Sequence, residues 1–585
     1  MRKAGLLFAL AAALLLPLAR CRMRPRTDYG ALESERHLTE TSGLDVFPSF
    51  SPDGLSVACA RDVSGAFEIH VMSLSGTSDV AVTSDGKQNV QPSFSPDGRF
   101  IAYHSKGRGG IWVVPASGGA PRPLADFGSK PAFSPEGDLV AFQSENLTDF
   151  LAVGALPPST IWVVPARGGP ARDVTRASVP AGGHGSPTFT RDGKRIFFVA
   201  TDPKFDASTL YSVGVDGKGM TRHVSLPRLF DPVVAPDGET VLISGGSAQR
   251  GYDLFRVALS GREAAKPPVA LHVTGVDIPR HLTLSPDGRR LVFAGVTTVG
   301  NIWSQPLDPK TQLAAGPPHP LTHGGRARST WPFPSPDGKT IVFGRQEPGA
   351  SQDVWVMDRD GGNPRPLVAG PANDVARGWF PSGKALFLTS NRSGEERVYS
   401  FDLDRREATL LPISTKDMAY PRLSPDGRRL VYGSRQGGST LNTWVMDVAS
   451  GRAEAITFDR EFFGYPFWSP DGKVIGAQVE RGDDFHIAVV PASGGDPTQL
   501  TFQSGLAWPF SFSPDSDKIA FAGYRQGYWN VWWVSRATRE EKRLTSFEKL
   551  NAFVRYPSWS PSGDQIVFEY AEGTGNLRVV EFGAR

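Results

Sequence analysis

The stretch Phe94-Ser95-Pro96-Asp97-Gly98-Arg99-Phe100-Ile101-Ala102-Tyr103 decides the fold of this 585-residue chain. Its tetrad 95–98 has the residue preferences of a type I turn: Pro presets φ, Ser and Asp bond nearby backbone, and Gly adopts the left-handed conformation. The apolar run 101–103 is continuous rather than alternating, which indicates a strand buried on both faces. A second apolar run, with a Trp, follows at 111–114. The stretch therefore predicts consecutive antiparallel strands of one small sheet.

The tetrad is repeated along the whole chain. Intact copies stand at 51–54, 95–98, 285–288, 335–338, 424–427 and 469–472, degenerate copies at 134–137, 190–193, 235–238, 513–516 and 560–563, and a contracted copy at 380–383. Pro52 and Pro561 are 509 residues and eleven steps apart, or about 46 residues per unit, which is in the range of propeller blades. A fourth short strand ends many units in Leu-Thr, as at 500–501. We therefore predict an all-β fold of tandem β-propellers with twelve four-stranded blades.

These repeats resemble the TolB-like, WD-repeat-like propeller family of bacterial proteins, in which the Ser-Pro-Asp-Gly turn joins the first two strands of each blade. The resemblance covers roughly residues 37 to 582 and implies the fold rather than a function. The small α/β domain that precedes the propeller in the TolB protein has no counterpart in the sequence. We therefore expect a relative of TolB, not TolB itself.

The ends of the repeat array predict how it closes. We expect two six-bladed propellers, at 37–307 and 320–585, joined by a linker at 308–319. In this scheme the short strand 37–39 completes the sixth blade beside 302–304, and the strand 320–322 completes the twelfth beside 577–580. Such closure removes an open sheet edge from each propeller.

The first residues predict export. Arg2 and Lys3 precede an apolar stretch at 4–19, so residues 1–21 are expected to be a signal peptide or a membrane anchor, followed by a linker at 22–36. Cleavage near Cys21 and lipidation of Cys21 both stay open. Retention of the segment as an anchor stays open as well, because arginines that follow an apolar run resist translocation. The predicted location is the periplasm or the cell envelope.

Composition and motifs exclude several functions. Lys and Arg total 63 against 60 Asp and Glu, without a basic stripe, so no nucleic-acid partner is expected. The sequence contains no Gly-x-Ser-x-Gly elbow, His-Glu-x-x-His helix, Walker loop or dinucleotide fingerprint. Its two cysteines and ten dispersed histidines match no metal-binding spacing. We therefore predict no catalytic residue, no metal and no cofactor.

The residue at the start of each first strand, in most repeats just before a Pro, differs between the two halves of the chain. In the C-terminal half it is aromatic in five of six blades: Trp331, Tyr420, Tyr465, Trp508 and Tyr556. In the N-terminal half the equivalent residues are Phe47, Gln91, Lys130, Ser186, Asp231 and His281. Because first strands line the axis of a propeller, our hypothesis is an aromatic funnel in the second propeller that binds a peptide, a sugar or a partner loop. The alternative is that these residues pack between blades.

The third blade carries an insertion at about 144–160 that contains Phe150 and Leu151. An apolar loop there is expected either to contact a partner or to cap the channel. Together these features predict a non-enzymatic exported scaffold that binds an envelope protein, a peptide or a glycan. The alternative is a hydrolase or lyase whose residues converge from separate blades in a channel, which a search for linear motifs cannot detect.

Overall fold

The computed structural model describes residues 27–584 except 42, 64, 145–158, 177–178, 181, 202–207, 248–250, 261–262, 265–266, 324, 326, 348–349, 414–417, 435, 437–440, 459–462 and 482–483. The expected signal segment and the loop residues Phe150 and Leu151 lie outside the described residues. Regular structure in the described part of the chain consists of strands alone. Across these same ranges we find no helix with the length and apolar character needed to cross a membrane.

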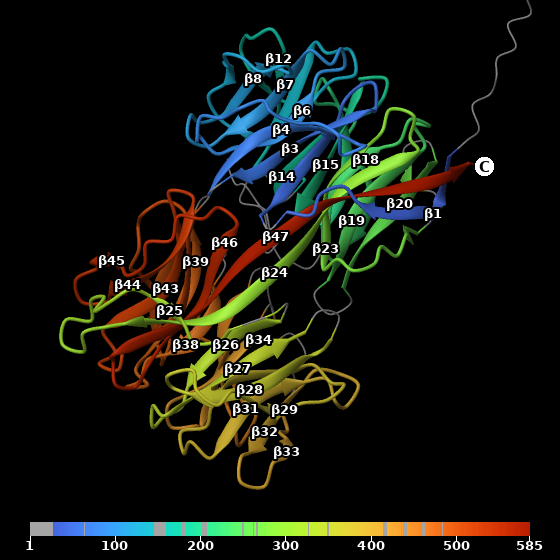
Figure 1. Cartoon of the computed structure of the whole chain (residues 1–585). Helices are drawn as coiled ribbons and strands as arrows, with labels where there is room; N and C mark the ends of the chain where they lie inside the picture. The colour runs from blue at the N-terminus through green and yellow to red at the C-terminus, as the bar shows by residue number, and fades with distance from the viewer. Residues whose placement is uncertain are drawn as a thin grey trace, which may run out of the picture.

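The first strands of the repeats form two closed rings within the described residues (Figure 1). The N-terminal ring consists of β2 (Asp45–Phe50), β6 (Asn89–Phe94), β10 (Ser129–Phe133), β14 (Gly183–Phe189), β18 (Leu229–Val234) and β23 (Ile278–Leu284). The C-terminal ring consists of β26 (Arg328–Pro334), β30 (Asp374–Trp379), β34 (Ala419–Leu423), β38 (Phe463–Trp468), β42 (Leu506–Phe512) and β46 (Ala552–Trp559). Each ring closes, since β2 contacts both β6 and β23, and β26 contacts both β30 and β46.

Three further strands extend outward from most inner strands. In the N-terminal ring they are β3 (Ser56–Val63), β4 (Ala66–Ser73) and β5 (Asp79–Ala81); β7 (Phe100–Ser105), β8 (Ile111–Pro115) and β9 (Arg122–Ala125); β11 (Leu139–Gln143), β12 (Ile161–Pro165) and β13 (Arg172–Asp173); β15 (Arg195–Thr201), β16 (Ser208–Gly214) and β17 (Thr221–Leu226); and β19 (Thr240–Ser247), β20 (Gly251–Ser260), β21 (Glu263–Ala264) and β22 (Val269–Ala270). In the C-terminal ring they are β27 (Thr340–Gln346), β28 (Gln352–Asp358) and β29 (Arg365–Val368); β31 (Ala385–Ser390), β32 (Arg397–Asp402) and β33 (Glu407–Leu410); β35 (Arg429–Ser434), β36 (Asn442–Asp447) and β37 (Ala453–Ala455); β39 (Val474–Arg481), β40 (Asp484–Pro491) and β41 (Thr498–Gln499); and β43 (Lys518–Arg525), β44 (Tyr528–Ser535) and β45 (Glu541–Arg543).

The Ser-Pro-Asp-Gly turn joins the first and second strands of each sheet, as its residues predict. In the first copy, Ser51 Oγ donates to Asp53 Oδ1 at 2.5 Å, and the Gly54 N–H donates to the Ser51 carbonyl at 2.9 Å. Gly54 has a φ of +69°, where a side chain would be strained. A Cβ at Gly54 would lie 3.3 Å from the ring of Pro286, in the turn after β23. The first turn therefore packs against the last one and helps to close the N-terminal ring.

Two long strands connect the rings. β24 (Arg290–Pro306) and β47 (Gln565–Ala584) pair antiparallel from Arg290 opposite Glu581 to Pro306 opposite Gln565. β24 starts beside β23 in the N-terminal ring and ends beside β25 (His319–Pro320) in the C-terminal ring. β47 starts beside β46 and ends beside β1 (Thr27–His37). In Figure 1 the pair crosses from the green and blue lobe to the yellow and red lobe.

The predicted pairing of the closing strands is therefore wrong. The sequence placed 37–39 beside 302–304, but the Leu577 N–H donates to Thr39 Oγ1 at 2.9 Å. The Ile302 N–H donates instead to Thr322 Oγ1 at 2.9 Å. Each half of the chain thus supplies the third strand that completes the other half's last sheet. Residues 307–318 connect β24 to β25, and most of the stretch 22–36, expected as a linker, forms β1.

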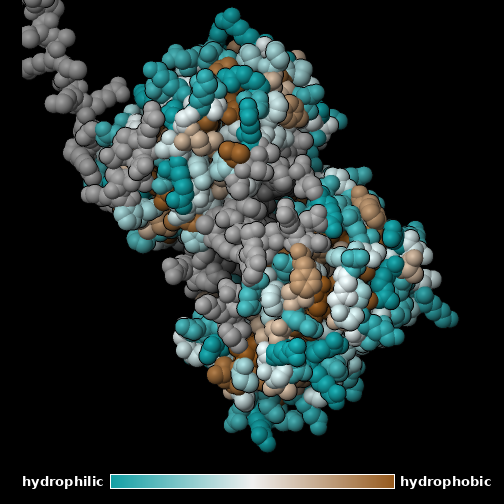
Figure 2. Space-filling model, turned by 180° about the vertical axis from the view of Figure 1, so that it is seen from behind, coloured by the Kyte–Doolittle hydropathy of each residue, from teal (hydrophilic) through white to brown (hydrophobic). Residues whose placement is uncertain are grey.

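The architecture is that of tandem β-propellers built from four-stranded antiparallel sheets. The number of blades, twelve, stays a prediction, because two of the described sheets merge strands of more than one repeat. One is the sheet of β24 and β47, and the other runs from β38 to β45 through a single parallel bridge between Phe485 and Leu506. Seen from behind, the surface is mainly hydrophilic with small, separate hydrophobic areas (Figure 2).

Candidate functional site: the channel of the C-terminal ring

The first strands share a backbone irregularity at the residue before the Pro. In both rings most first strands, all but β30 and β42, bulge at this position, as between Thr330 and Phe333 in β26. Most of these residues have a left-handed φ between 48° and 58°: Phe47, Gln91, Lys130, Ser186, Asp231, His281, Trp331, Tyr420, Tyr465 and Tyr556. A left-handed non-glycine residue is unfavourable by about 1–2 kcal/mol, so the surrounding sheets must hold it in place. The bulge brings these side chains into contact between strands of the ring.

Four of the five predicted aromatic residues meet in two pairs. The rings of Trp331 and Tyr556 stack with centroids 3.8 Å apart and planes 18° apart. The rings of Tyr420 and Tyr465 lie 4.1 Å apart, and Tyr420 Oη donates to Tyr465 Oη at 3.2 Å. All four side chains keep partial solvent exposure. Burial raises the pKa of Tyr465 and of Tyr556, so both phenols stay protonated.

Trp508 takes a different position. In β42 the bulge falls between Pro509 and Ser511, so Trp508 stays in register opposite Ala522. Its ring lies 4.9 Å from that of Trp529 and belongs to neither stacked pair. Phe510 contacts the Trp331–Tyr556 pair instead, with its ring 5.9 Å from Trp331 and 5.3 Å from Tyr556. Phe150 and Leu151 lie outside the described residues.

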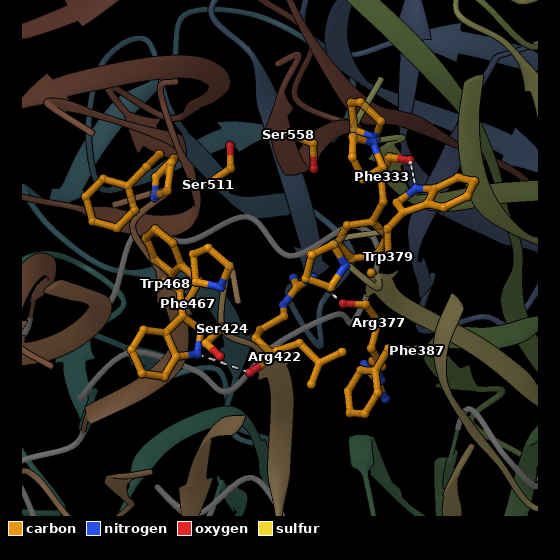
Figure 3. A pocket seen from close by; sticks show the side chains of 18 of the residues that line it. Phe333, Arg377, Trp379, Phe387, Arg422, Ser424, Phe467, Trp468, Ser511 and Ser558 are labelled. Atoms are coloured by element: carbon orange, nitrogen blue, oxygen red, sulfur yellow. Dashed lines mark hydrogen bonds between the residues drawn. The ribbon is translucent and has the colours of Figure 1, made fainter. Parts of the chain in front are cut away.

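A cavity of about 430 Å³ lies in the C-terminal ring, between these bulges and the Ser-Pro-Asp-Gly turns (Figure 3). Aromatic side chains make up much of its wall: Phe333, Trp379, Phe467, Trp468, Phe510 and Phe512. Two arginines, Arg377 and Arg422, also line it. Figure 3 shows Arg422 reaching from β34 into the space between the Trp379 side and the Phe467 side. We call this space the C-terminal channel.

The sequence did not single out the two arginines. Arg377 lies in β30, where the bulge, between Ala376 and Gly378, is as short as that of β42 and one residue shorter than in the other first strands. Arg422 follows the Pro of β34, where β26 and β38 carry Phe333 and Phe467. The signal that could have revealed both was a basic residue at a position that is aromatic in neighbouring repeats.

The centre of the N-terminal ring is polar instead of aromatic. The carboxylate of Asp231 forms two ion pairs. Its Oδ1 lies 3.1 Å from Lys130 Nζ, and its Oδ2 lies 2.9 Å from Arg280 Nε. Its Oδ2 also accepts the His281 N–H at 2.8 Å. These positive charges hold the pKa of Asp231 well below its usual range, against the opposing effect of burial. One buried carboxylate thus partners both cations of this ring.

Neither ring offers an evident metal site. Within the described residues there is no group of three or more His, Cys, Asp and Glu side chains placed to hold an ion. Lining residues of the C-terminal channel offer cations, aromatic faces and a few hydroxyls. Such a set can bind an anionic or aromatic group but supplies no nucleophile paired with a base.

The fold and this channel define a tandem β-propeller with an aromatic, cationic pore. The TolB beta propeller domain matches residues 30–156, 325–457 and 421–584. The chain belongs to the TolB β-propeller family.

Known relatives match only parts of the chain. An uncharacterized peptidase, YuxL, of Bacillus subtilis is 29% identical over 34% of this chain and 29% of its own length. A TolB homolog of Chlorobium luteolum is 30% identical over 25% of this chain and 33% of its own length. Thus the matched region spans about a third of each of these relatives. The solved structure of a putative TolB from Agrobacterium tumefaciens is 18% identical, with a TM-score of 0.27, over 60% of this chain and 94% of its own.

Proposed function

We propose that this protein is a non-enzymatic, exported scaffold that binds a protein, peptide or glycan partner in the cell envelope through its C-terminal channel. One observation carries the proposal: the channel brings aromatic side chains and two arginines together around a cavity of about 430 Å³. Aromatic and Arg side chains are the residue types that contribute most to binding at protein interfaces. The similarity to a TolB homolog and to a Tol-Pal system protein TolB supports a role in the cell envelope.

Affinity capture from an envelope extract tests this function. The wild-type chain is compared with the double variant Tyr420→Ala/Tyr465→Ala. These tyrosines do not line the cavity, but they lie two residues before its lining residues Arg422 and Phe467 on the same strands. The matched control is Ser186→Ala, at the equivalent position of the N-terminal ring. We expect a partner that wild type and Ser186→Ala retain equally and that the double variant retains at least tenfold less. Equal retention by a correctly folded double variant would contradict partner binding at this end of the C-terminal ring.

A catalytic site is the second candidate, because the N-terminal ring gathers Lys130, Asp231, Arg280 and His281 at its centre. An acid–base site needs a group whose pKa lies near the working pH. The carboxylate of Asp231 is instead a poor base, since its pKa is lowered and its oxygens accept bonds from three neighbours. This arrangement fits a structural ion cluster. Turnover of a peptide or polysaccharide panel, lost in Asp231→Asn, would support catalysis and overturn the scaffold proposal.

A further inference from the structure

Arg377 and Arg422 form a positively charged pair in the wall of the C-terminal channel. Arg422 Nη1 donates to the carbonyl oxygen of Arg377 at 3.0 Å, and Arg377 Nε donates to Thr389 Oγ1 at 3.2 Å. Within the part of the chain that the structure describes, neither guanidinium makes an ion pair with a carboxylate. Glu396 acts on Arg377 only as a more distant charge. Two cations therefore share one cavity without a direct counter-ion from those residues.

The faces of aromatic rings hold these guanidinium groups in place. The guanidinium carbon of Arg422 lies 4.3 Å from the ring centroid of Phe510 and 4.5 Å from that of Phe333. That of Arg377 lies 5.1 Å from the centroid of Trp331. Cation–π contacts orient an arginine but leave the in-plane edge of its guanidinium able to donate hydrogen bonds. The pair is thus positioned to receive an acceptor from the channel.

The electrostatic environment favours an anion at this place. Burial and the neighbouring charge of Arg377 lower the pKa of Arg422 to about 9, and burial also lowers the pKa of Arg377. At neutral pH both groups are still charged, so like charges are held together in a poorly hydrated space. A bound carboxylate would relieve this repulsion and accept charge-assisted hydrogen bonds.

The rest of the wall indicates what else the ligand carries. Ser511 Oγ donates to the Pro557 carbonyl at 2.9 Å, and Ser558 Oγ donates to the Pro332 carbonyl at 2.7 Å. The indole N–H of Trp379 donates to the backbone in the same way, at 3.0 Å from the Phe333 carbonyl. These polar groups already have backbone partners, so the wall offers few hydrogen bonds to a sugar rich in hydroxyls. An apolar ligand with a single anionic group fits this wall best.

In the N-terminal ring, an acid of the ring itself neutralises the buried cations. There Asp231 partners Lys130 and Arg280 within the ring itself. The C-terminal ring has Trp508 in the strand equivalent to that of Asp231 and supplies no such acid among the described side chains that line its cavity. The cations of the N-terminal ring thus have an acid between them, whereas no described acid lines the cavity around Arg377 and Arg422.

We propose that Arg377 and Arg422 bind the carboxylate of an apolar peptide segment of the partner protein. This inference rests on the proposed function and specifies the chemistry of the ligand. The carboxylate comes from one of two sources, a free C-terminus or an Asp or Glu side chain. In either case neighbouring apolar side chains of the peptide occupy the aromatic wall at Phe333, Phe467 and Phe510.

Three synthetic peptides test the inference by titration calorimetry. They are Ac-Ala-Phe-Ala-Phe with a free carboxyl end, Ac-Ala-Phe-Asp-Phe with an amidated end, and Ac-Ala-Phe-Ala-Phe with an amidated end, which has no charge. We expect wild type to bind one of the two anionic peptides at least tenfold more tightly than the uncharged one, because a charge-assisted pair with Arg is among the strongest of hydrogen bonds. Which of the two binds identifies the source, and the difference should shrink as salt is raised.

The variants Arg377→Met and Arg422→Met should each lose most of this tenfold preference. The matched control is Arg428→Met, whose side chain is exposed on the turn between β34 and β35 and should keep the preference. Near-ultraviolet circular dichroism checks that each variant folds, and the salt dependence of wild type provides the test if one does not. Equal binding of charged and uncharged peptides would overturn the carboxylate site while leaving the peptide-binding channel intact. Absence of binding for all three peptides, or a preference that both Arg variants retain, would also overturn it.

Discussion

The exchange of strands between the rings predicts that the far end of β47 stabilises residues near the start of the chain. Phe582 is 1% exposed and packs in the N-terminal ring, where its ring lies 5.0 Å from that of Tyr29. It belongs to the same buried cluster as Leu254 and Phe293. We therefore expect Phe582→Ala to destabilise the N-terminal ring, although Phe582 is only three residues from the C-terminus of the chain.

The expected magnitude follows from burial. Replacing a fully buried Phe by Ala removes its transfer free energy and leaves a cavity, which together cost about 3–5 kcal/mol. If the N-terminal ring opens independently, its open population should rise by a factor of roughly 200 to 5000, since 1.36 kcal/mol corresponds to a factor of ten. The matched control is Phe568→Ala, which removes an equally buried ring from the same strand but in the C-terminal ring.

The chain contains a separate probe for each ring. Cys59 is 0% exposed in β3, and burial raises the pKa of its thiol, so it should react only when the N-terminal ring opens. With Cys21→Ser in the background, Cys59 is the sole thiol. Of the 13 tryptophans, only Trp112 and Trp162 belong to strands of the N-terminal ring, so tryptophan fluorescence mainly follows the C-terminal ring.

Phe582→Ala should accelerate thiol labelling of Cys59 by the factor above, whereas Phe568→Ala should first lower the urea midpoint of tryptophan fluorescence. The same pair of probes tests whether the two rings are separable domains. If Phe582→Ala lowered the fluorescence midpoint but left Cys59 labelling at the wild-type rate, the assignment of this end of β47 to the N-terminal ring would be refuted.

Two titratable groups outside the candidate channel lead to further predictions. Asp231→Asn should cost the N-terminal ring about 3–5 kcal/mol, measured by Cys59 labelling, because it leaves Lys130 and Arg280 buried without a counter-ion. Because the pKa of Asp231 is lowered on folding, the wild-type protein has this stabilisation above about pH 4 and loses it as pH falls further. The Asp231→Asn variant should lack this acid-dependent loss of stability. Lys106 Nζ donates to the Gly527 carbonyl at 2.8 Å between the rings, and burial lowers its pKa from 10.5 to about 8. The unfolded chain then holds the Lys106 proton more tightly than the folded chain, so the urea midpoint of the wild-type protein should rise between pH 8 and 10.5. Lys106→Met should not show that rise. An equal rise in the variant would contradict the lowered pKa of Lys106.

The turns and the sheets they join could be predicted because their causes are local. Pro, Asp and Gly in the tetrad each favour one backbone conformation, and Gly54 and Gly98 adopt the left-handed φ that the turn requires. The apolar runs after the turns, such as 101–103, are fully buried as expected for strands between neighbouring sheets. These features depend on a few adjacent residues, so a single sequence contains enough information.

The strand exchange could not be predicted from the repeat alone, because either third strand is compatible with either sheet. A local signal nevertheless existed. Regular hairpins between second and third strands contain turn residues with positive φ, as at Gln526 and Gly527. The corresponding stretch of β24 contains Thr297-Thr298-Val299, and β-branched residues resist a positive φ. Without a turn, β24 continues straight, and its far end pairs with β47 and β25 in the C-terminal ring.

The charge balance of the channels depends on closure of the rings and so escapes any local pattern. Lys130 and Asp231 are 101 residues apart, yet they form an ion pair because β10 and β18 face the same axis. The sequence shows the basic residue before the Pro of β10 but not that an acid will meet it. The same holds for Arg422. The sequence shows an arginine after the Pro of β34, but it does not show that the described strands around this arginine lack a carboxylate. A ring that neutralises its own cations has a closed polar centre, whereas a ring that leaves them without an acid retains an electrostatic reason to bind one from outside.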